Sequence, residues 1–216
     1  MWYIAAQSDT PRPGKGPRDR LLVAALEYAL EQGIAGVSLR QLAAALGTSH
    51  RMLIHHFGSK EELLVAVIRA AEERQRSVMA EHFDQPDATP AEAGWRHWRE
   101  LSDPAFAPQE RLFFEVYVQA LRGRTWALPM LDGVVEDWVA DTSAHLQESG
   151  LPEAAARPAA RLGLAVTRGL LLDLLATGDR AGVDAAMELF FSLFAALEAG
   201  APSAPNPPNP PNPPST

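Results

Sequence analysis

A run of side chains able to contact the edges of nucleobases lies between Ser49 and Gly58. Its members are His50, Arg51, Met52, His55 and His56. An arginine can form two hydrogen bonds with the major-groove edge of guanine, and histidine or methionine can contact other base edges. If these side chains share the exposed side of a helix, they can read a DNA sequence.

The preceding residues predict a short helix that would support such a reading helix. Ser38 and Gln41 have the spacing of a capping box, in which the serine hydroxyl accepts from an early helical N–H and the glutamine reaches back to the cap. Apolar residues follow at helical spacing, namely Leu39, Leu42, Ala43 and Leu46. Gly47 supplies the left-handed conformation that ends a helix abruptly, so the chain is expected to turn there.

A second helix is expected from Ser49, which can cap it, to Gly58, which can end it. Its apolar positions are Leu53, Ile54 and Phe57. The small side chain of Ala43 would let the two helices cross closely, which is helix-turn-helix geometry. Ser59 and Glu62 form a further capping-box pair at the start of the next helix, whose first amides suit a phosphate group.

These residues resemble the DNA-binding domain of the TetR (tetracycline repressor) family of one-component regulators. The resemblance extends from about Arg18 to Leu64 and rests on Ser38, Leu42, Ala43, Gly47, Ile54, His56, Phe57 and Lys60. Two positions depart from the family pattern, because Thr48 stands where valine is usual and Ile54 where tyrosine is usual. Ile54 lacks a hydroxyl that could contact a phosphate.

The resemblance implies a fold and a role for individual residues. The fold is all-α, a nine-helix TetR-like architecture with an N-terminal three-helix helix-turn-helix domain and a C-terminal helical ligand-binding and dimerisation domain. Base reading is implied for Arg40, His50, Arg51, Met52 and His55. Phosphate contact is implied for Ser38, Ser49, His56 and Lys60. The expected partner is double-stranded DNA.

Two other interpretations of these residues were weighed. His50, His55 and His56 could bind a metal, but no cysteine or carboxylate lies at zinc-site spacing around them, so we predict no metal site and no cofactor. The chain could instead be a helical small-molecule-binding protein or enzyme with weak or lost DNA binding, which Ile54 would favour. No nucleophile, base and acid set and no phosphate loop supports catalysis, so we predict a protein that is not an enzyme.

The charge distribution favours a DNA-binding N-terminal end. The chain has a formal net charge of −8, yet residues 11–60 carry seven lysines and arginines against three acids, whereas residues 61–216 carry 12 against 23. The acidic remainder would repel phosphate and so orient the N-terminal end towards DNA. The chain contains no cysteine, no signal peptide is recognisable, and no apolar run is long enough to span a bilayer, so we expect a cytoplasmic protein without membrane contact.

Prolines and glycines divide the chain into four parts. We predict a flexible basic arm at 1–17, the helix-turn-helix domain at 18–64, the helical ligand-binding and dimerisation domain at 65–200, and a proline-rich disordered tail at 201–216 whose Asn-Pro-Pro repeat has the period of a polyproline II helix. After the reading helix, further helices are expected at 60–83, 90–102, 105–123, 127–149, 153–177 and 181–198.

Aromatic residues are concentrated in the middle of the second domain, where they either line a cavity or fill an ordinary core. The resemblance favours a cavity, since family members hold an effector inside this bundle. The residues expected near a small, mostly apolar effector are Trp98, Phe113, Phe114, Tyr117, Trp138, His145 and Arg168. Binding there is expected to shift the helix at 60–83 and spread the reading heads, which would release a repressor from DNA.

Two apolar stripes near the C-terminal end predict a homodimer. They comprise Leu162, Val166, Leu170 and Leu174 in one helix and Met187, Phe190, Phe191 and Phe194 in the next. Two such helices hold more apolar surface than one small domain can cover, and the same pair from a second copy would bury it. A C₂ dimer predicts a palindromic operator with half-sites about 34 to 36 Å apart. The alternative is that both stripes pack within the chain.

Overall fold

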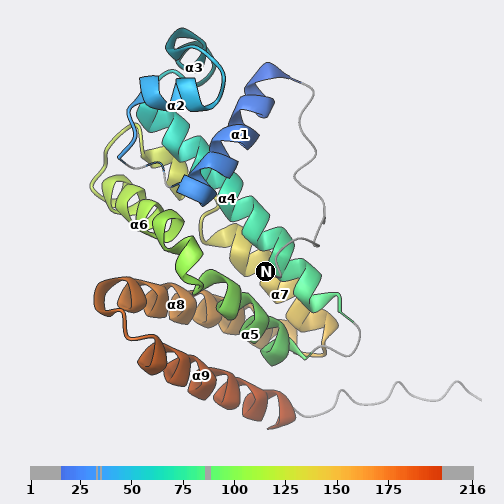
Figure 1. Ribbon diagram of the computed structural model, residues 1–216. Helices are drawn as coiled ribbons and strands as arrows, with labels where there is room; N and C mark the ends of the chain where they lie inside the picture. Colours follow the sequence, from blue (N-terminus) through green and yellow to red (C-terminus); the bar gives the residue numbers. More distant parts are fainter. Residues whose placement is uncertain (1–15, 33, 35, 86–88, 201–216) are drawn as a thin grey trace, which may run out of the picture.

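The computed structural model describes residues 16–32, 34, 36–85 and 89–200, which form an all-helical protein (Figure 1). Three helices gather at one end of the molecule: α1 (Pro17–Gln32), α2 (Leu39–Ala45) and α3 (His50–Phe57). The long helix α4 (Lys60–Phe83) runs from this head to the opposite end of the body. Most of the predicted arm and the whole predicted tail lie outside the described residues.

The body consists of five further α-helices: α5 (Pro90–Leu101), α6 (Ala107–Leu121), α7 (Glu136–Glu148), α8 (Glu153–Thr177) and α9 (Arg180–Gly200). α7 packs along α8, and α9 lies across α5 and α8 on the side away from the head (Figure 1). The nine α-helices of the described residues confirm the expected all-α, nine-helix architecture. No helix in these residues combines the length and apolarity that crossing a bilayer requires.

Two predicted helices differ from the observed ones. The helix expected at 105–123 is preceded by a 3-10 turn at Pro104–Phe106. The helix expected at 127–149 is a 3-10 turn at Leu128–Leu131 followed by α7, which begins only at Glu136. Gly133 separates the two with a φ of 73°, which is a conformation that a continuing α-helix does not contain.

The caps of the head helices form as their sequences predict, with one difference. The Ser38 hydroxyl accepts from the Gln41 amide at 3.3 Å, and the Gln41 side chain accepts from the Ser38 amide at 3.0 Å. Ser49 accepts from the Met52 amide at 3.2 Å. Ser59 accepts from the Glu62 amide at 3.0 Å, but the Glu62 side chain does not accept from the Ser59 amide in return. The turn and the end of α3 use Gly47 and Gly58, with φ values of 65° and 83°.

One hydrophobic cluster extends from the head into the body. It joins Leu42 and Leu53 of the head to Leu63 and Val67 of α4 and to Val116 of α6, all of them buried. The head therefore has no separate core, and α4 is packed on both sides of the predicted boundary at residues 64 and 65. A shift of α4 relative to α6 would consequently move the head with it.

Gly94 marks a close approach between α5 and α9. A Cβ atom at this position would lie 2.6 Å from Cε1 and 2.7 Å from Cζ of Phe191, so the ring would have to move. We expect Gly94→Ala to lower the free energy of unfolding by about 1 to 3 kcal/mol in urea denaturation. Gly163→Ala in α8 is the matched control, because its Cβ would meet nothing closer than Phe190 Cζ at 3.9 Å. Equal effects of the two substitutions would contradict this account.

Candidate nucleic-acid interface and ligand cavity

Helix α3, the predicted reading helix, divides into a buried and an exposed side. Leu53 and Phe57 are 1% and 7% exposed and fix the helix to the head. The five residues expected to read bases are all exposed: Arg40 on α2 and His50, Arg51, Met52 and His55 on α3. The capping residues Ser38 and Ser49 are exposed as well. All of these side chains are therefore exposed to solvent, as the predicted contacts with DNA require.

Three other positions of the head differ from their predicted environment. Ile54 is 38% exposed instead of being an apolar core position, and with Met52, 40% exposed, it adds an apolar surface of the kind that contacts thymine methyl groups. His56, assigned to a phosphate, is half-buried, and its carbonyl accepts from Arg18 Nε at 3.3 Å. Lys60 is half-buried at the start of α4. The negative charge of the adjacent Glu61 would repel a phosphate group there.

A cavity of about 100 Å³ lies inside the body and is lined by residues of all six helices from α4 to α9. Its aromatic lining consists of Phe83, Phe113, Trp138, Phe190, Phe191 and Phe194. Its polar lining consists of Glu72, Gln75, His97, Glu110, Thr142, Thr167 and Arg168. Three of the seven predicted ligand-binding residues therefore line it, namely Phe113, Trp138 and Arg168.

The other four predicted ligand-binding residues lie outside the lining. Trp98 is 1% exposed and packs towards α9, where its Nε1 donates to Asp184 at 2.8 Å. His145 stacks on Phe83 at 4.7 Å between ring centroids. The remaining two contact the ring of Phe113. Phe114 meets it edge-on with 5.3 Å between ring centroids, and Tyr117 stacks on it with 5.6 Å between ring centroids.

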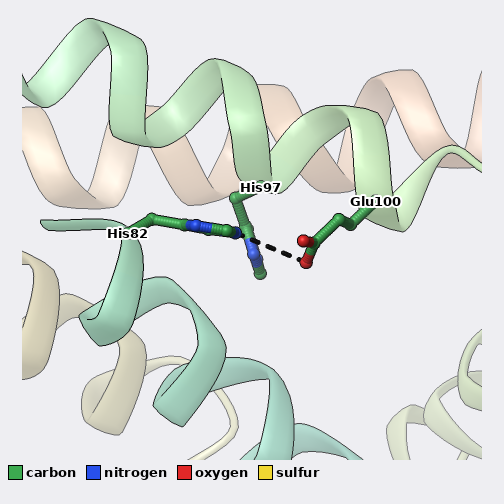
Figure 2. Close-up of side chains that lie close together, drawn as sticks. All are labelled: His82, His97 and Glu100. Atoms are coloured by element: carbon green, nitrogen blue, oxygen red, sulfur yellow. Dashed lines mark ion pairs between the residues drawn. The ribbon is translucent and has the colours of Figure 1, made fainter. Parts of the chain in front are cut away.

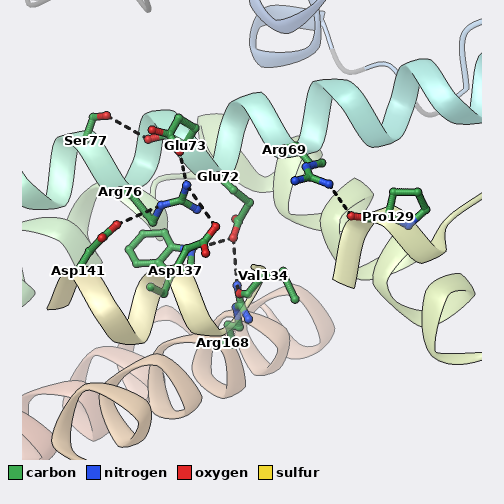
Figure 3. A network of polar contacts seen from close by, with 11 residues as sticks. Arg69, Glu72, Glu73, Arg76, Ser77, Pro129, Val134, Asp137, Asp141 and Arg168 are labelled. Carbon is green, nitrogen blue, oxygen red and sulfur yellow. Dashed lines mark hydrogen bonds and ion pairs between the residues drawn. The ribbon is translucent and has the colours of Figure 1, made fainter. Parts of the chain in front are cut away.

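Two largely buried acids of the cavity were not predicted, and one of them is the centre of a polar network (Figure 3). Glu72 of α4 accepts from Trp138 Nε1 at 2.8 Å and from Arg168 Nη2 at 3.0 Å. Arg168 of α8 also donates to the Val134 carbonyl at 2.8 Å, and its guanidinium lies 4.9 Å from the centre of the Phe113 ring. The network therefore links α4, α7 and α8 at the cavity wall.

The sequence did contain a signal for Glu72. It is four residues from Ile68 and three from Gln75, so helical spacing places it on the inward side of α4. Its neighbour Glu73, by contrast, is exposed and pairs with Arg76. Glu110, the second buried acid, is 8% exposed in the first turn of α6.

Burial shifts the protonation of the cavity's ionisable groups. It raises the pKa of Glu110 to about 8, an effect that the charge of Glu72 increases and that of Arg168 opposes. Burial also raises the pKa of Glu72, although Arg168 and the hydrogen bond from Trp138 act against it. Burial lowers the pKa of His97 to about 3, and the neighbouring His82 adds to this shift. At neutral pH the cavity thus holds a neutral Glu110 beside the pair of Glu72 and Arg168.

Further polar contacts attach α4 to α7 (Figure 3). Arg76 Nε lies 3.3 Å from Asp141 Oδ2, and Arg76 Nη2 lies 3.7 Å from Asp137 Oδ2. Nearer the head, Arg69 donates to the Pro129 carbonyl at 2.8 Å. The middle part of α4 is therefore held by α7 and by the 3-10 turn at Leu128–Leu131.

The stripes predicted to form a dimer interface lie mostly inside the chain. Met187 is 0% exposed and Phe194 is 9% exposed. Val166, Leu170, Leu174, Phe190 and Phe191 are half-buried against the clusters beneath α8 and α9. Leu162 alone of the eight is exposed. The stripes turn inward because they cover the cavity and Trp98, and the apolar residues left facing solvent on these helices are Leu162, Leu172, Leu189 and Leu193.

Comparisons with known proteins agree with this architecture. Residues 21–67 match the family model for bacterial regulatory proteins of the tetR family. The chain is 32% identical over 93 residues to the HTH-type transcriptional repressor DrrR1 of Streptomyces coeruleorubidus, which covers 41% of this chain and 30% of that protein. The matching stretches span about a third of the length of the first curated relatives.

Two examples illustrate the solved structures that resemble most of the chain. A transcriptional regulator from Rhodococcus sp. Rha1 has a TM-score of 0.64 at 23% identity, covering 84% of this chain and 97% of that one. The multidrug binding protein EbrR, crystallised with proflavin, has a TM-score of 0.57 at 28% identity, covering 82% and 98%.

An N-terminal helix-turn-helix packed onto an all-helical body defines a class of DNA-binding regulatory proteins. Through the match of residues 21–67 and the likeness of its fold, the chain is similar to members of the TetR family within that class. The family consists of transcriptional regulators and not of enzymes, in agreement with the sequence-based expectation.

Proposed function

We propose that this protein is a homodimeric repressor that binds a palindromic operator and leaves it when a small effector enters the body. The observation that carries the proposal is the exposed side of α3, where His50, Arg51, Met52 and His55 face solvent while Leu53 anchors the helix. An exposed arginine beside polar and apolar side chains on a short, well-anchored helix suits base readout in the major groove.

The effector that fits the cavity best has an aromatic body and a cationic group. Aromatic rings contribute a large part of the wall, and Glu110 can release its proton to solvent when a cation binds beside it and Glu72. The likeness to EbrR, described as a multidrug binding protein and crystallised with proflavin, supports this choice. This adds a charge to the mostly apolar effector expected from the sequence.

Effector binding must enlarge the cavity, which gives it a way to move the head. The observed volume of about 100 Å³ is well below the roughly 300 to 1,000 Å³ of ordinary ligand pockets. Because Glu72 ties the cavity wall to α4, and α4 shares a hydrophobic cluster with the head, outward movement of the wall would displace the reading helix. The effector would then stabilise a state in which the distance between the two head domains of the dimer no longer matches the two half-sites of the operator.

The dimer would form through the outer side of α8 and α9. Leu162, Leu172, Leu189 and Leu193 are 52% to 62% exposed there. Pairing these helices with the same two of a second copy would give a four-helix interface, for which about 800 Å² per partner is typical. The two copies of α3 would then need a spacing of about 34 to 36 Å, one turn of DNA.

Arg51→Ala tests the reading helix. After selection of bound sequences from random or genomic DNA, the affinity of the best operator is measured by fluorescence anisotropy. We expect the substitution to cost about 1 to 3 kcal/mol and to relax specificity at one base pair of each half-site.

Arg99→Ala is the control, because it removes the same charge from an exposed position on α5. Equal losses in the two variants would mean that Arg51 contributes only charge. If the protein selected no DNA at low salt, it would instead be a small-molecule-binding protein that lacks DNA affinity.

A further inference from the structure

Two buried histidines and a glutamate converge between the end of α4 and the C-terminal half of α5 (Figure 2). His82 lies in the last turn of α4 and is 9% exposed, and His97 of α5 is 5% exposed. Glu100 follows His97 by three residues, so the two side chains share a face of α5. The Glu100 side chain is 44% exposed, which leaves this corner of the cluster open to solvent.

The imidazole nitrogens of this cluster have no hydrogen-bond partners. Both ring nitrogens of His82 and both of His97 are buried without one among the described protein atoms. His82 Nε2 lies 3.4 Å from Glu100 Oε2, but the two atoms are not aligned for a hydrogen bond. A buried polar atom without a partner lowers the stability of the folded protein by about 1 to 3 kcal/mol. Four such nitrogens in two adjacent rings therefore indicate a ligand that would bind some of them.

The spacing of the three side chains fits a metal ion. One ligand atom from each residue can be chosen so that all three lie within 4.8 Å of one another. Two ligands bonded at about 2.0 to 2.1 Å to a tetrahedral ion are roughly 3.3 Å apart, which is close to the separation of His82 and Glu100. Small rotations of the rings would bring the third atom to the same distance.

We propose that His82, His97 and Glu100 bind a divalent transition-metal ion of the zinc type, through one nitrogen of each imidazole and one carboxylate oxygen. Two imidazoles and a carboxylate suit zinc, cobalt or nickel better than magnesium or calcium, which prefer oxygen ligands. Three protein ligands leave a position for water or another small ligand on the exposed side.

A metal in this site would connect two parts of the repressor mechanism. It would fix the end of α4 to α5, and α4 carries the reading head at its other end. His97 also lines the effector cavity and lies against Trp138, with 5.5 Å between ring centroids. Sequence patterns do not reveal this site, because 14 residues and a helix break separate His82 from His97.

Zinc titration of the full chain without an affinity tag tests the proposal. The protein is freed of metal with a chelator, dialysed, and titrated with zinc chloride in a calorimeter. We expect one ion per chain with a micromolar or tighter Kd. Glu100→Gln, at a partly exposed position where the fold should tolerate an amide, is expected to weaken binding at least about tenfold.

Glu148→Gln is the matched control. Glu148 also follows a histidine by three residues and lies 3.4 Å from His145 Nδ1, but no second histidine joins that pair. Its substitution should leave the zinc affinity unchanged. Cobalt chloride is the second probe, and the wild-type protein but not Glu100→Gln should give the intense d–d absorption of a site with low coordination number.

Three results would overturn the assignment. The first is the absence of saturable zinc binding. The second is equal zinc affinity of the wild-type protein and Glu100→Gln. The third is loss of the zinc site on substitution of His55, whose ring lies 5.0 Å from that of His56 on α3, since the ion would then bind the reading helix. In any of these cases His82 and His97 form a metal-free core pair.

Discussion

Arg168→Met is expected to lower the free energy of unfolding by about 3 to 5 kcal/mol at neutral pH. The guanidinium and the Glu72 carboxylate lie 3.0 Å apart, and their side chains are only 16% and 19% exposed. Without Arg168, the buried carboxylate would keep the hydrogen bond from Trp138 but lose its opposite charge. Methionine fills a similar volume, so urea denaturation would report mainly the unpaired charge.

Two comparisons separate this effect from a general loss of arginine. Arg157→Met removes an exposed ion pair with Glu136 from the same helix and should cost no more than about 1 kcal/mol. The double variant Glu72→Leu with Arg168→Met removes both charges and should recover most of the loss. Similar losses for the Arg168 and Arg157 variants would contradict the assigned role of the buried pair.

The pH dependence of the Arg168 variant gives an independent check. Burial raises the pKa of Glu72 and Arg168 opposes the rise, so removing Arg168 raises this pKa further. A group whose pKa is higher in the folded than in the unfolded state contributes stability that is lost as the pH rises through the folded value. The loss caused by Arg168→Met should therefore be smaller at pH 5 than at pH 8.

Local sequence signals were sufficient for the head and for α4. Capping serines and glycines with positive φ determine where α2 and α3 begin and end, and they act within one turn. The predicted helix at 60–83 is the observed α4, since Ser59 caps one end and the prolyl segment after Gln85 follows the other. The prediction of a helix at 127–149 was wrong in its first half. Pro129 and Gly133 are enough to interrupt the helix there, but the apolar residues around them continue a helical pattern and conceal the break.

The cavity and the outer surface of α8 and α9 depend on contacts between distant residues. α8 carries apolar residues on more than one side, so its periodicity does not say whether Leu170 or Leu172 faces inward. The inward side is chosen by what lies beneath it, here the cavity and Trp98 of α5. A buried acid such as Glu110 is equally hidden from sequence analysis, because exposed acids are far commoner in helices.

Glu110→Gln is expected to stabilise the protein above neutral pH and to flatten its pH dependence. Burial raises the pKa of Glu110 from 4.5 to about 8, and the ionisable groups around the same cavity are Glu72 on α4, Arg168 on α8 and His97 on α5. The unfolded chain releases the proton above about pH 4.5 whereas the folded chain keeps it to about pH 8, so stability falls between these values. The total loss is on the order of 4 kcal/mol.

Glutamine imitates the neutral acid and cannot ionise, so the variant should lose this decline in urea denaturation between pH 5 and 8. Glu115→Gln is the control, because Glu115 is exposed on the same helix and its substitution should leave the decline unchanged. Parallel curves for the wild-type protein and Glu110→Gln would show that Glu110 ionises in the folded state as it does in the unfolded chain.

The same variant tests the proposed class of effector. A cation bound beside Glu110 favours the ionised carboxylate, so its binding must release a proton wherever the free protein is protonated. The affinity for proflavin, a planar cation that is fluorescent, should therefore rise from pH 6 to pH 8 in the wild-type protein. Glu110→Gln should bind it more weakly and with little dependence on pH. A neutral aromatic dye that bound equally well to both proteins, together with pH-independent proflavin binding, would favour an uncharged effector.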